Sequence, residues 1–400
     1  MHKVRLLRTR TAAVLVTATA LATLVAACGS SSPAAPGGGS SKSPILIGAP
    51  FALSGAEASI GQAGLDLAEK YVSRINGQGG INGRELKLVT LDTKTDLTTG
   101  ILDIKKLIGQ HVTAMIGVTD TGLAMQMLPL VNRAKIPVLA DVGGGSFNNP
   151  APKYFFKIPE NDSVAAKVEL TYMKSQGITK IAWLGINQSY GQSGYKAFKA
   201  TSQEVGVSLL DNDFYPEDST NLTPQLTRAR GLGGQALLLY GIPPSASIAQ
   251  QEIANLNFKI PVYQSYGVAT SDFVKATGAA ADGVKLVGGK LQVYKQLPAS
   301  DPQLPAIKDF EALSGGSQNR FAGDTYDCME LLTKAIKAVG PDSQKIQQYV
   351  EGVQDYNGVT GVISYSSKIH AGVSGSSLAI LKIQDGAFKL VKTGAQVLGS

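Results

Sequence analysis

The chain has 400 residues, a formal net charge of +7 and two cysteines. Four of its basic residues lie in the first 27 positions, which hold no acid, so +7 less 4 leaves +3 for the remainder. This small charge gives no support for nucleic-acid binding. With so few cysteines the fold must depend on a hydrophobic core, and a folded length of roughly 355 residues usually divides into two domains.

The first predicted element is an N-terminal export signal. A basic start over residues 2–10 precedes an apolar, alanine-rich run at 11–27, an order typical of secretory signals. Small side chains then precede Cys28, and residues 24–29 (LVAACG) resemble the lipobox of bacterial lipoproteins, in which the cysteine is lipidated and becomes the new N-terminus. The alternative is a transmembrane anchor, although a run of about 17 residues is short for a span of about 20. Residues 28–43 are rich in Ser, Gly and Pro and predict a flexible tether.

Short apolar runs alternate with amphipathic stretches in the next part of the chain. The first amphipathic stretch carries Leu65, Ala68, Val72 and Ile75 on one helical face. The predicted strands are 45–49, 86–91, 114–118 and 136–140, and the predicted helices between them are 61–76, 98–110 and 122–134.

The same alternation begins again after Asn161. Repeated strand–helix units predict parallel sheets covered on both faces, and two successive sets predict two such domains. The second set comprises helices 164–176, 190–205, 223–230 and 245–256 with strands 180–185, 207–214, 236–240 and 260–264. Helices 304–313, 323–339 and 343–352 and strands 378–383 and 388–391 complete the chain.

Six motifs follow one another in a specific order. They are IGAP followed by LSG within 47–55, INGQGGING within 68–92, AMIG with polar residues at 114–121, IPV at 136–138, SYGQSG at 189–194 and FAGDTYDCMELL at 321–332. In this order they resemble the branched-chain-amino-acid group of solute-binding proteins that feed ABC transporters. The resemblance covers the chain from residue 45 to about residue 391.

This resemblance implies an α/β fold of the periplasmic-binding-protein type I, with two doubly wound parallel-sheet lobes and a ligand in the cleft between them. A hinge of three crossings, near 157–160, 287–291 and 357–361, would join the lobes. Lobe one would comprise 45–158 plus 290–357, and lobe two 159–288 plus 360–400. The chemistry agrees, because parallel sheets bind ligands beyond the carboxyl ends of their strands, where helix N-termini attract anions.

Lobe one is expected to contribute three loops to the ligand site. The first is the loop that carries Ser54. The second contains Thr119, Asp120 and Thr121, whose hydroxyls and neighbouring N–H groups suit a carboxylate; the alternative is that Asp120 or Thr121 merely caps the next helix. The third contains Gly144 and Gly145, which allow close approach of the backbone to a ligand, or else form a plain flexible turn.

Lobe two is expected to contribute Tyr190, Ile242 and Tyr266. Tyr190 matches an aromatic contact of the family and would cover an apolar ligand face, with core packing as the alternative. Ile242 stands where amino-acid binders tend to have tyrosine, and Tyr266 where they have an acid for the ligand ammonium. Because a buried ammonium needs a paired charge and no acid is expected beside Tyr266, weak binding of leucine, isoleucine and valine is predicted.

Asp324 stands where the family more often has an aromatic residue. It is expected either to bind an ammonium or hydroxyl from lobe one, as the one acid there able to replace the missing partner, or to cap the predicted helix 323–339. Asp327 is expected to serve the fold. Cys328, within the same helix, is expected to be a small buried apolar residue.

The sequence offers little for catalysis. It holds no G-x-S-x-G elbow, no P-loop and no Cys/His zinc spacing, so no enzyme activity, cofactor or metal is expected. The expected partners are a small-molecule solute, an ABC permease with its ATPase subunits, and the membrane through the N-terminal lipid, on the outer face of the cytoplasmic membrane. The alternative is a ligand-sensing lipoprotein that signals through a membrane receptor partner.

Overall fold

The computed structural model describes residues 43–145, 147–148, 150–210 and 213–399. The predicted signal, the predicted lipidation site at Cys28 and all of the predicted tether except its last residue lie outside the described residues. Among the described residues no helix is both long enough and apolar enough to span a membrane. The description below concerns the unit from Lys42 onward.

The first sheet is entirely parallel, with strand order β2-β1-β3-β4-β5. Its strands are β1 (Ile45–Phe51), β2 (Leu86–Asp92), β3 (Ala114–Met115), β4 (Val138–Ala140) and β5 (Phe155–Lys157). The predicted strands 114–118 and 136–140 are therefore shorter in the structure. The chain leaves the ladder early after β3 and β4, which frees the residues that follow to face the site.

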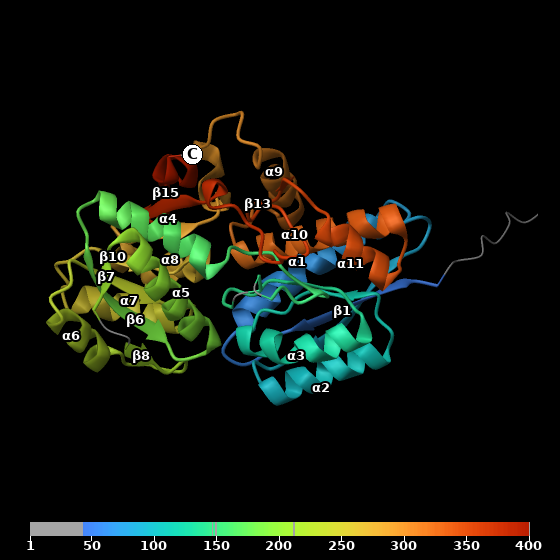
Figure 1. Ribbon diagram of the computed structural model, residues 1–400, viewed down its shortest axis with the longest axis horizontal. Coiled ribbons are helices and arrows are strands. Elements are labelled where there is room, and N and C mark those ends of the chain that lie inside the picture. Colours follow the sequence, from blue (N-terminus) through green and yellow to red (C-terminus); the bar gives the residue numbers. More distant parts are fainter. Residues whose placement is uncertain (1–42, 146, 149, 211–212, 400) are drawn as a thin grey trace, which may run out of the picture. The chain divides into compact units, whose positions relative to one another are not determined.

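Helices cover both faces of the first sheet (Figure 1). One face carries α2 (Leu97–Gly109) and α3 (Thr121–Ala134), and the other carries α1 (Ala58–Gly77) with the later helices α9 (Leu304–Ser314), α10 (Arg320–Val339) and α11 (Ser343–Glu351). Helix α10 begins three residues before its predicted start. Asn319 is its N-cap and accepts from the Phe321 N–H at 2.9 Å, so the predicted capping role of Asp324 is wrong.

The second sheet has eight strands, and its order is β15-β14-β11-β10-β9-β6-β7 with β8 also paired to β6. Six of its strands are parallel: β6 (Lys180–Ile186), β7 (Ser208–Leu209), β8 (Asp213–Tyr215), β9 (Ala236–Tyr240), β10 (Val262–Gln264) and β11 (Lys285–Gly288). The two late strands, β14 (Ala379–Gln384) and β15 (Ala387–Thr393), add antiparallel at one edge. The predicted strand 207–214 is thus two short strands, and β11 was not predicted as a strand.

The second sheet has its own helices and short turns. They are α4 (Asp162–Ser175), α5 (Ser189–Val205), α6 (Thr223–Gly231), α7 (Ser245–Asn255), α8 (Ser271–Thr277), α12 (Gly394–Leu398) and the 3₁₀ segments η1 (Tyr266–Val268), η2 (Gly278–Ala281), η3 (Leu291–Gln296) and η4 (Gly375–Ser377). A separate two-stranded ribbon pairs β12 (Tyr356–Asn357) with β13 (Val362–Ile363).

The chain passes between the two sheets three times: after β5, after β11, and between β13 and β14. Asp327 holds the segment before the third passage, because its carboxylate accepts from the N–H groups of Val359 at 3.0 Å and Thr360 at 2.8 Å. The stretch that follows also contacts the first sheet, since Ala371 forms a bridge with Lys157. We refer below to the two sheets with their helices as the first and second halves.

Candidate functional site

A small buried cavity lies where strand ends of the two halves meet. Its volume is about 20 Å³, room for one or two water molecules at roughly 10–15 Å³ each. It is lined by Glu57, Ile60, Thr119, Thr121, Asp141, Gly143, Arg320 and Phe321 from the first half and by Tyr190, Ile242 and Gly267 from the second. Because it holds so little space, a solute larger than water enters only if the halves separate.

The loops after β1 and β3 place Glu57 and Thr119 together. Glu57 directly precedes α1, yet its carboxylate does not cap that helix. It accepts instead from the Thr119 hydroxyl at 3.0 Å and is 3% exposed. Burial raises the pKa of Glu57 to about 8, and the nearby carboxylates of Asp120 and Glu217 raise it in the same direction.

Asp141 follows β4 directly and is 2% exposed, and neither of its carboxylate oxygens has a hydrogen-bond partner among the described residues. Burial and the adjacent Asp324 carboxylate raise its pKa well above the usual range. Beside it, the Arg320 guanidinium lies 2.9 Å from Asp324 Oδ2 and 3.6 Å from Glu160 Oε2. Asp324 also accepts from the Thr360 hydroxyl at 2.7 Å.

In the second half, Asp162 at the start of α4 organises three hydroxyl groups. Its Oδ1 lies 2.6 Å from the Tyr240 hydroxyl and 2.7 Å from the Tyr266 hydroxyl, and its Oδ2 accepts from Ser193 at 2.9 Å. The Tyr190 ring packs against the Tyr240 ring at a tilt and meets the Tyr266 ring edge-to-face, and its buried hydroxyl has no partner among the described residues. One buried carboxylate therefore orients the two tyrosines that lie behind Tyr190, the tyrosine that lines the cavity.

Hydrogen bonds join the two halves beside the cavity. The Tyr266 hydroxyl is 2.6 Å from the Gly143 carbonyl oxygen, which also accepts from Lys157, and the Gly145 N–H donates to Ser193 Oγ at 3.0 Å. Gly144 lies between them, and a Cβ there would be 2.4 Å from Ser193 Oγ. A residue without a side chain is therefore required for this close approach.

Four of the predicted ligand residues line the cavity: Thr119, Thr121, Tyr190 and Ile242. The other six lie around it or apart from it, and they are Ser54, Asp120, Gly144, Gly145, Tyr266 and Asp324. Asp120 caps α3, accepting from the Leu123 N–H at 2.6 Å. Ser54 is away from the cavity and donates to Asp92 at 2.7 Å.

The remaining four positions are Gly144, Gly145, Tyr266 and Asp324. Gly144 donates its N–H to Thr121 Oγ1 at 3.2 Å, and Gly145 bonds Ser193 as above. Tyr266 is fully buried behind Tyr190 and next to Asp162, so the expectation that no acid neighbours it is wrong. Asp324 lines a second small space of about 10 Å³ beyond Arg320. The expectation that Asp324 is the one acid available from the first half is also wrong, because Glu57 and Asp141 line the cavity itself.

Sequence reasoning missed Glu57, Asp141 and Arg320. The signal for Asp141 was present, since it follows a predicted strand as Thr119 does. Arg320 was hidden by the late predicted start of its helix. Glu57 lies in an irregular loop, where no periodic pattern indicates the direction of a side chain.

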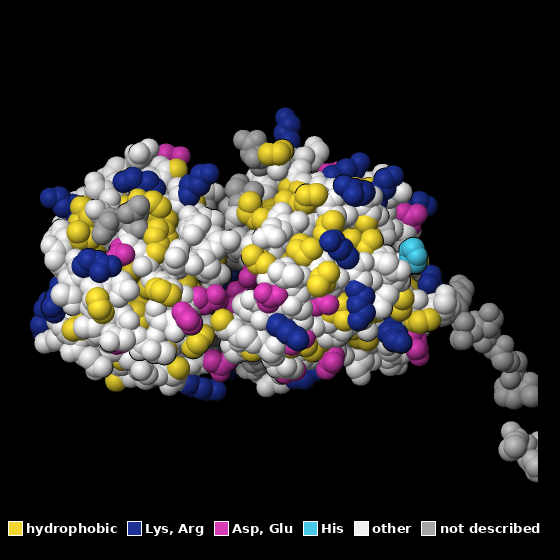
Figure 2. All heavy atoms as spheres, turned by 90° about the horizontal axis from the view of Figure 1, so that it is seen from below, with side chains coloured by type: hydrophobic (Ala, Val, Ile, Leu, Met, Phe, Trp, Pro, Cys, Tyr) yellow, Lys and Arg dark blue, Asp and Glu magenta, His cyan; other side chains and the backbone are white. Residues whose placement is uncertain are grey.

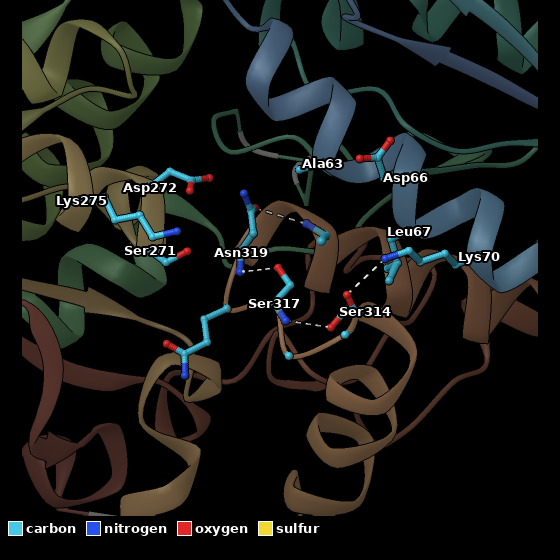
Figure 3. Close-up of a pocket in the computed structure, with 14 residues that line it drawn as sticks. Ala63, Asp66, Leu67, Lys70, Ser271, Asp272, Lys275, Ser314, Ser317 and Asn319 are labelled. Carbon is cyan, nitrogen blue, oxygen red and sulfur yellow. Dashed lines mark hydrogen bonds between the residues drawn. The ribbon is translucent and has the colours of Figure 1, made fainter.

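A larger groove of about 530 Å³ lies between α1, α8 and the loop that precedes α10 (Figure 3). Asp272 and Lys275 of α8 lie across it from Asp66 and Lys70 of α1. The groove is open, and none of the predicted site residues lines it. The described residues contain no group of three or more His, Cys, Asp or Glu side chains able to hold a metal ion.

The sequence over residues 44–387 matches the model of a family described as periplasmic binding protein. The chain belongs to this family. Its members are binding proteins rather than enzymes, and they work outside the cytoplasm. The predicted assignment to the branched-chain-amino-acid type is confirmed by the similar proteins described next.

Leu/Ile/Val-binding protein homolog 3 of Brucella melitensis is 21% identical over 346 residues, which cover 86% of this chain and 92% of that protein. Leu/Ile/Val-binding protein BraC3 of Rhizobium johnstonii is 20% identical over 325 residues, covering 80% and 87%. An extracellular ligand-binding receptor from Rhodopseudomonas palustris HaA2 has a TM-score of 0.81 at 23% identity, covering 88% of this chain and all of its own. LivJ of Streptococcus pneumoniae in complex with isoleucine has a TM-score of 0.76 at 22% identity, covering 87% and 99%. These structures confirm the predicted α/β fold.

Proposed function

We propose that this protein is the extracytoplasmic solute-binding component of an ABC importer. It captures a small amino-acid-like or carboxylate solute between two lobes, 45–158 plus 290–357 and 159–288 plus 360–400. Lipidation at Cys28 tethers it to the outer face of the cytoplasmic membrane, and an ABC permease with its ATPase subunits receives the solute.

The buried cavity between the halves carries this proposal. Residues from strand ends of both halves line it, which is where parallel α/β sheets bind ligands. Only about 20 Å³ is enclosed, so capture of a solute requires the halves to open and close about the three chain passages. The hydrogen bonds of Tyr266 to Gly143 and of Gly145 to Ser193 would then stabilise the closed state.

A thermal-shift screen of the purified protein tests the proposal. A solute at 100 times its Kd is expected to stabilise the protein by about 2.7 kcal/mol. Small-angle scattering with each stabilising solute is expected to show a smaller radius of gyration than without it. If amino acids, amines, amides and carboxylates all leave the melting temperature and the radius unchanged, the protein does not act as a small-solute receptor.

A further inference from the structure

Two acidic side chains in the cavity form no ion pair among the described residues, although the Arg320 guanidinium acts on Asp141 from a longer distance. Among the described residues neither Glu57 nor Asp141 has a Lys, Arg or His nitrogen within 4.0 Å of its carboxylate. Both are almost fully buried, and Asp141 has no hydrogen-bond donor at either oxygen. Burying a carboxylate without a partner is costly, so this arrangement suits a site whose missing donor arrives with the solute.

Arg320 also lines the cavity, but its charge is already balanced. Its guanidinium contacts Asp324 and Glu160 and lies over the Tyr266 ring, 5.3 Å from the centroid. Its charge is therefore offset by two carboxylates before a solute arrives, while its buried Nη2 has no hydrogen-bond partner among the described residues.

The wider surroundings of the cavity are acidic as well. The buried carboxylates of Glu57, Asp141, Glu160, Asp162 and Asp324 outnumber the buried cations of Lys157 and Arg320. The partly exposed Asp120 and Glu217 lie close enough to interact electrostatically with Glu57, and the exposed Asp218 interacts with Glu217. Figure 2 shows Asp and Glu side chains gathered in the middle of the view. An acidic site and approach attract cations and repel anions.

We propose that the solute carries a cationic amine, which lies between Glu57 and Asp141 against the first half while its apolar part lies against Tyr190, Ile242 and Phe321. This inference rests on the proposed capture of a small solute and narrows its chemistry. A carboxylate is not needed for binding, and an amine without one binds more tightly than the corresponding amino acid.

An anionic solute at the same site would show the opposite pH dependence of its affinity. Protonated Glu57 and Asp141 would donate hydrogen bonds to an anionic solute; burial raises the pKa of both groups, and the pKa of Glu57, about 8, permits its protonation at neutral pH. An amine requires the ionised acids, so its affinity rises with pH as Glu57 loses its proton around its pKa of about 8. An anion requires the protonated acids, so its affinity falls over the same range. The groups that act on these titrations are Asp120, Glu217 and Thr119 around Glu57, and Asp324, Glu160 and Arg320 around Asp141.

Three probes with the same apolar body separate these cases. Isopentylamine carries the amine alone, 4-methylpentanoate the carboxylate alone, and leucine both. Calorimetry on the purified protein from pH 6 to pH 8.5 is expected to give the tightest binding for isopentylamine, weaker binding for leucine and none for 4-methylpentanoate. Tighter binding of 4-methylpentanoate than of isopentylamine would overturn the inference, and so would amine affinity that falls as the pH rises.

Glu57→Gln and Asp141→Asn are the informative variants, because each removes one charge with little change in shape. Each is expected to weaken isopentylamine binding at least tenfold while raising the melting temperature of the solute-free protein. Glu169→Gln is the matched control. Glu169 on α4 is fully buried with both oxygens unpartnered among the described residues, but it does not line the cavity. It is expected to raise the melting temperature and leave the amine affinity unchanged.

The failures of this inference and of the proposed function are distinguishable. Equal amine affinity for the wild type, Glu57→Gln and Asp141→Asn would refute the cationic subsite. Closure on a carboxylate or a neutral solute, with no binding of any amine, would refute it as well but leave solute capture intact. Absence of binding and closure with every class of solute refutes both.

Discussion

Substitution of Gly144 by alanine is expected to block closure of the cleft without unfolding either half. The new Cβ would lie 2.4 Å from Ser193 Oγ and 2.9 Å from the Tyr190 Cα atom. The hydroxyl can rotate away, but the backbone at Tyr190 can move only if α5 moves. Overpacking of this kind costs roughly 1–3 kcal/mol, and the cost falls on the closed state because the open state separates these atoms. The closing equilibrium is therefore expected to shift by about 5- to 150-fold.

Scattering and calorimetry on the same samples measure this shift. Gly144→Ala is expected to show a larger radius of gyration than the wild type at equal solute concentration, and a weaker affinity by the factor above. Gly231→Ala provides the control, since it lies at the end of α6 and a Cβ there meets no atom within 4 Å. If Gly144→Ala closes to the wild-type radius with the wild-type affinity, the close contact between Gly144 and α5 does not limit closure.

Four further outcomes follow from the contacts. Ser193→Ala is expected to favour the open state by about 1–3 kcal/mol, because the Gly145 N–H then lacks its acceptor in the closed state. The measured effect is a larger radius of gyration, and Ser202→Ala on the same helix should leave that radius unchanged. The melting temperature without solute should fall from pH 5 to pH 8, because burial raises the pKa of Glu57 from 4.5 in the unfolded chain to about 8. The stability that protonated Glu57 retains below pH 4.5 is lost as the pH rises through this range. Glu57→Gln should flatten the dependence of melting temperature on pH, and a melting temperature that rises with pH would contradict this. Asp327→Ala should lower the unfolding free energy by roughly 2–4 kcal/mol in denaturant titrations, since three donors lose their acceptor; a loss below 1 kcal/mol would mean that water replaces it. Cys28→Ser should leave the precursor uncleaved or release it from the membrane fraction on immunoblots, and processing and retention like the wild type would contradict lipidation.

The sequence predicted the alternation of elements well, because long apolar and amphipathic runs are local signals. It failed where an element is short or begins without a strong local signal. β3 has two residues, so its predicted continuation to residue 118 is loop, and the true start of α10 at Arg320 depends on the Asn319 cap. That error of three residues placed Arg320 outside the helix that carries it into the site.

The site was only partly predictable for a different reason. Thr119, Thr121, Tyr190 and Ile242 were identified from positions that follow strands or begin helices, and the structure does place them around the cavity. The partners of Tyr266 could not be inferred, since Asp162 lies 104 residues away in the chain and the two meet only after the second half has folded. Judged by its own residue type, Tyr266 offers no acid, whereas the structure places the Asp162 carboxyl group beside it.

The excess of buried acid at this site costs stability, and that cost indicates what the site does. A fold selected for stability alone would fill the cavity with apolar groups or pair each carboxylate, as it pairs Lys290 with Asp301 at 2.7 Å elsewhere. Glu57 and Asp141 remain unpaired at the place where both halves meet, so the closed state without solute contains two desolvated acids. A cationic solute would supply the missing charge in the closed state, while water solvates the two carboxylates in the open state. Capture and closure are thereby coupled, because the solute that satisfies these acids is also the one that makes the closed form favourable.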